Sequence, residues 1–202
     1  FSFLISFGQN SLQNGLVAWY PFEGNASDMS GNGNHGTVNG ATLGTDRHGQ
    51  VNRSYIFDGI DDNIVIQEIN SFEAQKHTLS VWVFAQQWHG DIMSKDGEAS
   101  QRQWLIGSAP ANGEIIAHVW TSSSFYQGKS IFSLKPNQWN NIIQIWNSSS
   151  LALYINGFLQ SETQTFGSLA LGDQPIRIGG GAPESFPLWF NGSIDDIRIY
   201  DR

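Results

Sequence analysis

Cysteine is absent from the 202-residue sequence. No disulfide can therefore stabilise the fold, and neither a thiol nucleophile nor a thiolate metal site is possible. Charged residues are also scarce, at 14% of the chain, and acidic residues outnumber Lys and Arg by 18 to 10. The net charge of −8 argues against nucleic acid and anionic membranes as partners, because both require clustered basic residues.

Sustained helical periodicity is missing as well. Only residues 71–76 have the composition of a helical turn, with Ser71 as its N-cap. The chain consists instead of short apolar runs separated by turn residues, and it contains 22 Gly, 13 Phe and 8 Trp. This pattern is typical of an all-β protein, and it predicts one domain folded as a two-sheet antiparallel jelly-roll sandwich.

Residues 1–8 are apolar and carry no charge, and they are too few to span a bilayer. Ser6, Phe7 and Gly8 satisfy the small-x-small rule for signal-peptide cleavage. We therefore interpret residues 1–8 as the remnant of a secretory signal and residues 9–202 as the mature domain. The alternatives are a natural first strand or a vector remnant.

Residues 28–36, Asp-Met-Ser-Gly-Asn-Gly-Asn-His-Gly, are rich in glycine and asparagine. Glycine adopts positive φ, and Asn and Asp tolerate it, so this segment predicts a tight loop with exposed carbonyl groups. Together with such carbonyls, the side-chain oxygens of Asp28, Asn32 and Asn34 are the ligands that Ca²⁺ prefers. The alternative is a plain Gly/Asn turn.

A carboxylate pair, Asp195 and Asp196, opens the last apolar-alternating segment of the chain. We expect this strand to lie near the loop at 28–36 and to supply carboxylates to the same cation. Residue parity places Asp195 on the side of Ile197 and Ile199, at the rim of the core face. The alternative is a solvated strand entry.

Residues 78–84, Thr-Leu-Ser-Val-Trp-Val-Phe, are apolar on both parities. Such a run predicts a central strand that is covered on both faces. Four tryptophans lie in apolar strands of this kind, and we expect them in the core: Trp19, Trp82, Trp139 and Trp146.

Sugar recognition on β-sandwiches uses exposed aromatic rings with a few planar polar side chains. Aromatic and polar residues at strand ends or in polar loops are therefore the predicted ligand-binding set: Trp88, His89, Arg102, Trp120, Tyr126 and Trp189, with Gln103 beside Arg102. The loops at 88–102 and 122–126 are the expected binding loops. Local packing is the alternative interpretation for each residue.

Catalytic motifs are weak. Glycoside hydrolysis needs two carboxylates on one face, but the seven glutamates are scattered along the chain. A lyase site could be assembled only from His118, Gln144, Tyr154 and Arg177, and neither a Gly-x-Ser-x-Gly elbow nor a His-x-x-x-His pair is present. We therefore expect a non-catalytic binding module. A polysaccharide lyase or glycoside hydrolase is the first alternative, and a structural spacer or protein-interaction domain is the second.

The order and spacing of the motifs over residues 15–202 resemble the laminin-G-like (type 3) domain of the concanavalin A-like lectin/glucanase superfamily. The resemblance rests on residues 15–36, Phe-Asp-Gly-Ile-Asp-Asp at 57–62, Leu-Ser-Val-Trp at 79–82, Trp139, Leu-Tyr-Ile-Asn-Gly at 153–157, and residues 192–202. It implies a jelly roll with a structural Ca²⁺, for which Asp28 and Asp195 are the main side-chain ligands.

The same resemblance implies a module that is usually non-catalytic and that accompanies enzymes or adhesins in a larger bacterial protein. A glycan or a cell-surface partner, without membrane insertion, is then expected for a secreted or surface-exposed chain.

Overall fold

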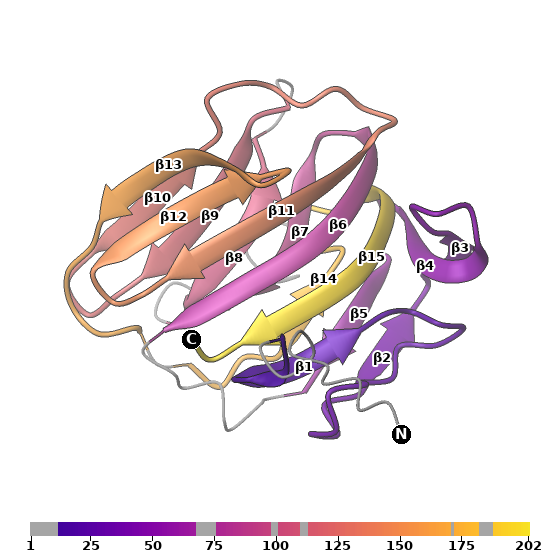
Figure 1. Ribbon diagram of the computed structural model, residues 1–202, viewed down its shortest axis with the longest axis horizontal. Coiled ribbons are helices and arrows are strands. Elements are labelled where there is room, and N and C mark those ends of the chain that lie inside the picture. Colours follow the sequence, from indigo (N-terminus) through magenta and orange to yellow (C-terminus); the bar gives the residue numbers. More distant parts are fainter. Residues whose placement is uncertain (1–11, 68–75, 98–100, 110–112, 171, 182–187) are drawn as a thin grey trace, which may run out of the picture.

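The computed structural model describes residues 12–67, 76–97, 101–109, 113–170, 172–181 and 188–202. The predicted leader at 1–8 and, apart from Lys76, the predicted helical turn at 71–76 lie outside the described residues. Within them the chain forms fifteen strands in two antiparallel sheets (Figure 1), which confirms the predicted all-β jelly roll. Among the described residues, no helix is long and apolar enough to cross a membrane.

The eight-stranded sheet has the order β13-β12-β11-β6-β15-β4-β3, and β1 pairs with β15 outside this path. Its strands are β1 (Leu16–Tyr20), β3 (Thr42–Thr45), β4 (Val51–Asp58), β6 (His77–Gln87), β11 (Trp139–Trp146), β12 (Ser150–Ile155), β13 (Phe158–Gln164) and β15 (Asn191–Tyr200). The last strand therefore lies in the middle of the sheet, although it is formed from the end of the chain.

The seven-stranded sheet has the order β10-β9-β8-β7-β14-β5-β2 and packs against the first. Its strands are β2 (Gly36–Asn39), β5 (Asn63–Ile66), β7 (Gly90–Lys95), β8 (Trp104–Ser108), β9 (Ile115–Trp120), β10 (Phe125–Lys129) and β14 (Ile176–Ile178). Parts of the predicted binding loops at 88–102 and 122–126 thus belong to β7 and β10.

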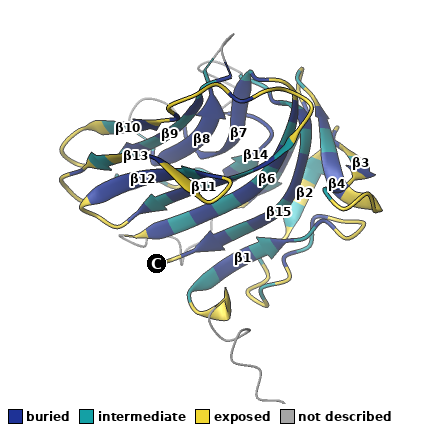
Figure 2. Cartoon of the chain, turned by 45° about the horizontal axis from the view of Figure 1, so that its top comes forward, coloured by how far each residue is buried: buried dark blue, intermediate teal, exposed yellow. Residues whose placement is uncertain are grey.

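The core lies between the two sheets. In β6, Leu79, Val81 and Val83 are fully buried between the layers, whereas Trp82 and Phe84 are half-buried on the outer face. This alternation appears along the central strands in Figure 2. The expectation that β6 is fully covered on both faces was therefore wrong.

The tryptophans divide between the core and the outer face. Trp146 is fully buried, as predicted, and His77 lies against it with ring centroids 5.6 Å apart. Trp19, Trp82 and Trp139 are only half-buried, because their strands turn the opposite parity toward the core. The prediction that these three belong to the core was wrong.

Strand β15 changes its partner half-way along. Its first half pairs with β4 and its second half pairs with β1. Between the two halves the register with β6 shifts at Asp195 and Asp196, and Asp196 adopts a φ of 42°. This bulge interrupts the alternation, so Asp195 lies opposite Trp82 on the outer face rather than with Ile197 and Ile199. The predicted side was wrong because counting parity assumes an unbroken pleat.

Candidate functional site

Asp28 organises the loop at residues 28–36. Its Oδ1 accepts hydrogen bonds from the backbone N–H groups of Trp19 (3.0 Å) and Ser30 (2.8 Å). Its Oδ2 accepts from the Ser30 hydroxyl (2.8 Å) and from the Asn34 N–H (3.0 Å). Burial alone would raise the pKa of Asp28, but these donors hold the pKa below its ordinary value. The carboxylate is therefore ionised at neutral pH.

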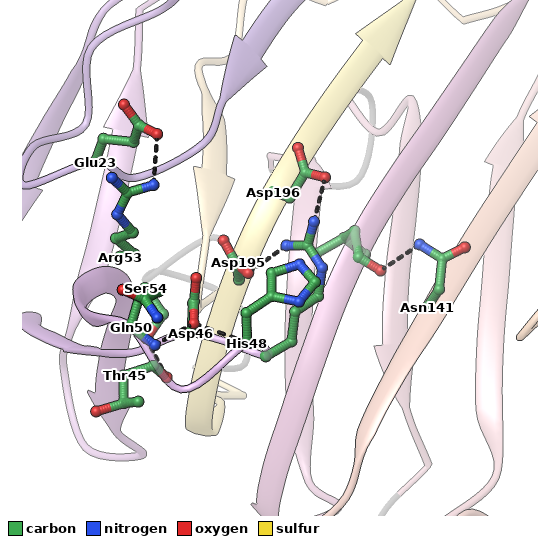
Figure 3. Close-up of polar contacts among 12 residues, drawn as sticks. Glu23, Thr45, Asp46, His48, Gln50, Arg53, Ser54, Asn141, Asp195 and Asp196 are labelled. Atoms are coloured by element: carbon green, nitrogen blue, oxygen red, sulfur yellow. Dashed lines mark hydrogen bonds and ion pairs between the residues drawn. The ribbon is translucent and has the colours of Figure 1, made fainter.

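Asp195 and Asp196 bind the guanidinium of Arg47. Arg47 Nη1 donates to Asp195, and Nη2 donates to Asp196 over 3.1 Å (Figure 3). The guanidinium carbon also lies 5.1 Å from the centre of the Trp82 ring. Arg47 lies in the turn between β3 and β4. It thus binds the two residues of β15 that separate the half paired with β4 from the half paired with β1.

Trp19 connects these two polar groups. Its backbone N–H donates to Asp28, and its indole Nε1–H donates to Asp196 Oδ1 over 2.8 Å. We call Trp19, Asp28, Arg47, Asp195 and Asp196 the Trp19 junction. It ties the first strand and its loop to the last strand of the fold.

The five predicted metal ligands do not gather around one point in the described structure. Asn32 and Asn34 donate their side-chain N–H groups to the Val17 carbonyl. The two carboxylates of β15 face Arg47, and each oxygen of Asp28 accepts two hydrogen bonds, from groups of Trp19, Ser30 and Asn34. Among the described residues, only one group of three or more His, Cys, Asp or Glu side chains has its ligand atoms within 4.8 Å of one another, namely Asp58, Asp61 and Asp62. Calcium binding at the predicted residues stays a prediction.

A cluster of aromatic and planar polar side chains lies on the outer face of the seven-stranded sheet. His118 and Trp120 belong to β9, and β10 places Gln127 opposite His118 and Phe125 opposite Trp120. The ring centroids of Trp120 and Phe125 are 5.1 Å apart, and those of His118 and Phe125 are 4.8 Å apart. The intervening residues of β9 are buried in the core. Together with Arg102, these four residues are called the Trp120 platform.

Arg102 joins the aromatic cluster to a buried carboxylate. Its guanidinium carbon lies 5.5 Å from the centre of the Trp120 ring, and its Nε lies 3.3 Å from Asp96 Oδ1. The backbone carbonyl of Asp96 accepts a hydrogen bond from Arg177 over 3.1 Å. Although Arg102 Nε and Asp96 Oδ1 form an ion pair, neither atom has a hydrogen-bond partner.

Two more buried polar atoms of this part of the sheet lack hydrogen-bond partners. They are the Ser94 hydroxyl oxygen, in a residue with 0% exposure, and Gln103 Oε1, in a residue with 1% exposure. Gln103 lies next to the platform, because its carbonyl accepts a hydrogen bond from the Trp120 N–H. Buried polar atoms without partners are energetically unfavourable, so each calls for a structural or functional explanation.

The titratable groups near the platform are perturbed by burial. Burial, together with the positive charges of Arg102 and Lys129, lowers the pKa of His118 to about 4. His118 is thus neutral at pH 7, and its Nε2 can accept the hydrogen bond from Gln127 Nε2, 2.6 Å away. Burial and the nearby Asp96 carboxylate, opposed by the charge of Arg102, raise the pKa of Asp91 to about 8.

Of the six predicted ligand-binding residues, the structure brings together Arg102 and Trp120. Trp88 lies in the core with 5% exposure, so it offers no free ring face. Tyr126 has the opposite parity from Phe125 and packs against the core. His89 and Trp189 are half-buried, and the Trp189 ring lies so close to Gly180 that a Cβ there would meet it at 2.4 Å.

Sequence reasoning missed Phe125 and Gln127 as site residues and considered His118 only for a lyase. The four residues of that alternative do not share one face. Gln144 is fully buried between the sheets, and Tyr154 lies on the eight-stranded sheet, away from His118. The signal that could have found the platform is the pair of short aromatic strands around the turn at 121–124, because a hairpin there brings their aromatic residues opposite each other.

Residues 58–202 match the profile of the laminin G type 3 family, described as the Concanavalin A-like lectin/glucanases superfamily. The chain belongs to this family. This confirms the resemblance inferred from the motifs. A comparison with curated protein sequences gives no match for this laminin G type 3 domain.

Solved structures with the same fold include domain 4 of AbnA, an extracellular GH43 arabinanase from Geobacillus stearothermophilus, in complex with arabinotriose. Its TM-score is 0.73 at 20% identity, over 92% of this chain and 91% of that domain. A chain of botulinum neurotoxin type C, whose cell entry depends on interaction with two ganglioside molecules, gives a TM-score of 0.72 at 15% identity, over 96% of this chain and 49% of that one.

The binding domain of botulinum neurotoxin DC, in complex with rat synaptotagmin II, gives a TM-score of 0.71 at 14% identity, over 95% of this chain and 49% of that one. The laminin G type 3 domain thus spans about half of the neurotoxin chains. At these identities the likeness shows a shared fold.

Proposed function

We propose that this laminin G type 3 domain is a non-catalytic saccharide-binding module and that the Trp120 platform is its binding site. The observation that carries the proposal is the cluster of partly exposed aromatic rings with the planar polar side chains of Gln127 and Arg102 beside them. Phe125 is 45% exposed and lies beside Trp120, so the two rings can take up the C–H face of a sugar. Gln127 and Arg102 can donate hydrogen bonds to its hydroxyl groups.

The similar structures support a saccharide as the class of ligand. Domain 4 of AbnA was solved with arabinotriose, and the neurotoxin of type C interacts with gangliosides. These proteins share the fold of this domain over more than nine-tenths of its length. Arabinotriose is therefore the first probe, followed by an array of neutral and sialylated glycans.

The test is a binding titration with the wild type, Trp120→Ala and a matched control, Phe158→Ala. Phe158 is an aromatic residue with 74% exposure at the start of β13, away from the platform. We expect Trp120→Ala to weaken binding at least tenfold, about 1.4 kcal/mol, and Phe158→Ala to leave it unchanged. Failure of every glycan to bind the folded domain, or equal binding by Trp120→Ala, would exclude the proposal and favour a spacer or protein-interaction role.

The same samples test the catalytic alternative. Polysaccharides incubated with the domain are examined for new reducing ends, for the unsaturated products of a lyase, and for loss of chain length. We expect no turnover, because the residues considered for lyase chemistry lie on different faces of the sandwich. Turnover that a single Asp or His substitution abolishes would overturn the binding-only proposal.

We also propose that Ca²⁺ stabilises the loop at residues 28–36. The support is the oxygen-rich composition of the loop and the ionised state of Asp28. Because Arg47 already neutralises the carboxylates of β15, the proposal depends on Asp28. A chelator should lower the melting temperature by roughly several degrees relative to millimolar Ca²⁺. An unchanged melt in excess chelator would refute calcium binding and leave the saccharide proposal intact.

We propose further that the domain acts outside the cell, as an adhesion or substrate-targeting module of a larger bacterial protein. The support is the apolar segment at residues 1–8 and the similarity to a domain of an extracellular arabinanase. Fractionation of cells that express the full gene tests this location. Retention of the product in the cytoplasm would exclude it.

A further inference from the structure

A groove of about 540 Å³ lies on the outer face of the eight-stranded sheet, whereas the Trp120 platform lies on the outer face of the seven-stranded sheet. Its lining residues are Leu12, Thr78, Ser80, Ile143, Ile145, Arg198, Tyr200 and Arg202. We call it the β6 groove, because small residues of β6 form its floor.

The strand register explains why a groove forms here. On β6, Ser80 lies between Ile143 of β11 and Arg198 of β15. Two residues earlier on β6, Thr78 lies in the same way between Ile145 of β11 and Tyr200 of β15. Small hydroxyl side chains in the central strand thus lie between larger side chains on both neighbours. The two walls are two strand spacings apart, about 10 Å, which admits one extended chain.

The floor and the walls differ in chemistry. Thr78 Oγ1 donates to the Arg202 carbonyl over 2.6 Å, and Ser80 Oγ accepts from Asn141 over 3.3 Å, so the floor is polar. The β11 wall consists of the two isoleucines and is aliphatic. Sugar rings combine an apolar C–H face with polar edges, and a groove with one apolar wall and a hydroxyl floor matches both.

The charged side chains that line the β6 groove are all positive. They are those of Arg198 and Arg202, and no Asp or Glu is among the described lining residues of the groove. A second depression of about 290 Å³, beyond Arg198 and Tyr200, likewise has no carboxylate in its described lining. In a chain with 18 acidic and 10 basic residues, this selection favours an anionic ligand.

Arg198 is already held in position to meet such a ligand. Its Nη2 lies 3.3 Å from Asp196 Oδ1, and its guanidinium carbon lies 5.2 Å from the centre of the Trp19 ring. The side chain still has 31% exposure. Because Asp196 and Trp19 already hold the guanidinium while part of it stays exposed to solvent, Arg198 loses little conformational entropy when it binds a carboxylate.

We propose that the β6 groove is a second saccharide site, which binds a linear oligosaccharide that carries carboxylates, such as an oligouronate. The isoleucine wall contacts the C–H faces of the sugar units. The floor hydroxyls meet their hydroxyl groups, and the arginines of the β15 side bind their carboxylates.

The test compares trigalacturonate with its methyl ester, which is neutral and otherwise closely matched. Titrations use the wild type, Ser80→Tyr, which fills the groove, and Arg202→Gln, which removes one charge from an exposed residue near the chain end. We expect binding of the acid, at least fivefold weaker binding of the ester, at least tenfold weaker binding of the acid by Ser80→Tyr, and a loss of several-fold in Arg202→Gln. Phe158→Ala is the control, and near-UV circular dichroism verifies the fold of each variant.

Other results would overturn the proposal. These are no binding of the acid, equal binding of acid and ester, or unchanged binding by a folded Ser80→Tyr variant. Loss of acid binding in Trp120→Ala would place the ligand on the Trp120 platform instead. Because the platform is tested with Trp120→Ala and arabinotriose, failure of one site is distinguishable from failure of the other.

Discussion

Two arginines on opposite faces of the sandwich have closely similar surroundings. Arg47 lies over Trp82 and binds Asp195 and Asp196, while Arg102 lies over Trp120 and pairs with Asp96. Each carries its charge between an indole ring and a buried carboxylate. The two arginines differ in the number of hydrogen bonds that they donate to their carboxylate partners.

Arg47 donates a hydrogen bond to each of its two carboxylates and connects segments 148 residues apart in the chain. Arg102 is nearer to the surface, with 33% exposure, and its Nε has no hydrogen-bond partner although Asp96 lies beside it. An arginine whose two terminal nitrogens both bind carboxylates stabilises the fold, whereas one that is paired only through Nε keeps its terminal N–H groups for a ligand. The same pair of residue types therefore serves structure on one face and, as we propose, recognition on the other.

Arginine-to-alanine substitutions test this difference most directly. Arg47→Ala leaves Asp195 buried without its cation, so we expect it to lower the free energy of unfolding by about 3 kcal/mol. For Arg102→Ala we expect a smaller loss of about 1 kcal/mol, because the charge of Arg177 and the Gly97 N–H still stabilise the Asp96 carboxylate, together with the loss of saccharide binding. Urea unfolding measures both, and Arg53→Ala is the control, since Arg53 and its partner Glu23 are both about half exposed. Equal losses from Arg47→Ala and Arg102→Ala would remove the distinction.

Asp28 anchors the other half of the Trp19 junction. Asp28→Ala removes an acceptor of four hydrogen bonds and leaves the Trp19 and Asn34 N–H groups without that partner. We expect a loss of about 2 kcal/mol. In a domain of this size that corresponds to a fall in melting temperature of about 4 to 8 °C. Asp28→Asn keeps the shape and should lose less; a thermal melt in which neither variant differs from the wild type would contradict the anchoring role.

Asp91 makes the face that carries the Trp120 platform sensitive to pH. Its pKa is raised to about 8, whereas the carboxyl of an unfolded chain titrates near 4, so the folded protein holds a proton that the unfolded chain has released. The stability from this group is complete below pH of about 4 and is lost as the pH rises through about 8. Its largest slope is about 1.4 kcal/mol per pH unit.

The measurement is the free energy of unfolding of the wild type and Asp91→Asn between pH of about 5 and 8. The wild type should lose stability relative to the variant as the pH rises. His118 has a lowered pKa and acts in the opposite direction, but it is present in both proteins and cancels in the difference. Parallel curves would show that Asp91 does not retain its proton.

Much of the fold could be predicted from the sequence. The short apolar runs and turn residues predict antiparallel sheets, because strand periodicity and turn chemistry are local properties. Trp146 was predicted correctly as a core residue, but Trp82 was not. Both lie in apolar strands, and hydrophobicity alone does not tell which face of a strand is covered by a second layer.

The residues of the Trp120 platform were harder to predict from the sequence than the fold. Trp120 and Arg102 could be selected because they adjoin polar segments, whereas Phe125 and Gln127 become site residues only through the pairing of β9 with β10. Trp88 was predicted as a ligand residue from its polar surroundings in sequence, yet it packs in the core.

The sequence by itself determined the fold class and the family. It also predicted that the loop at residues 28–36 and the last strand lie near each other. These conclusions depend on residue type and spacing. Only the tertiary structure decided that Arg47 meets Asp195 and Asp196, because a bulge in β15 shifts the alternation and a turn from another strand supplies the cation. The tertiary structure also decided which aromatic residues share an outer face. Contacts between distant segments depend on register and layer packing, and neither is encoded in any single stretch of the chain.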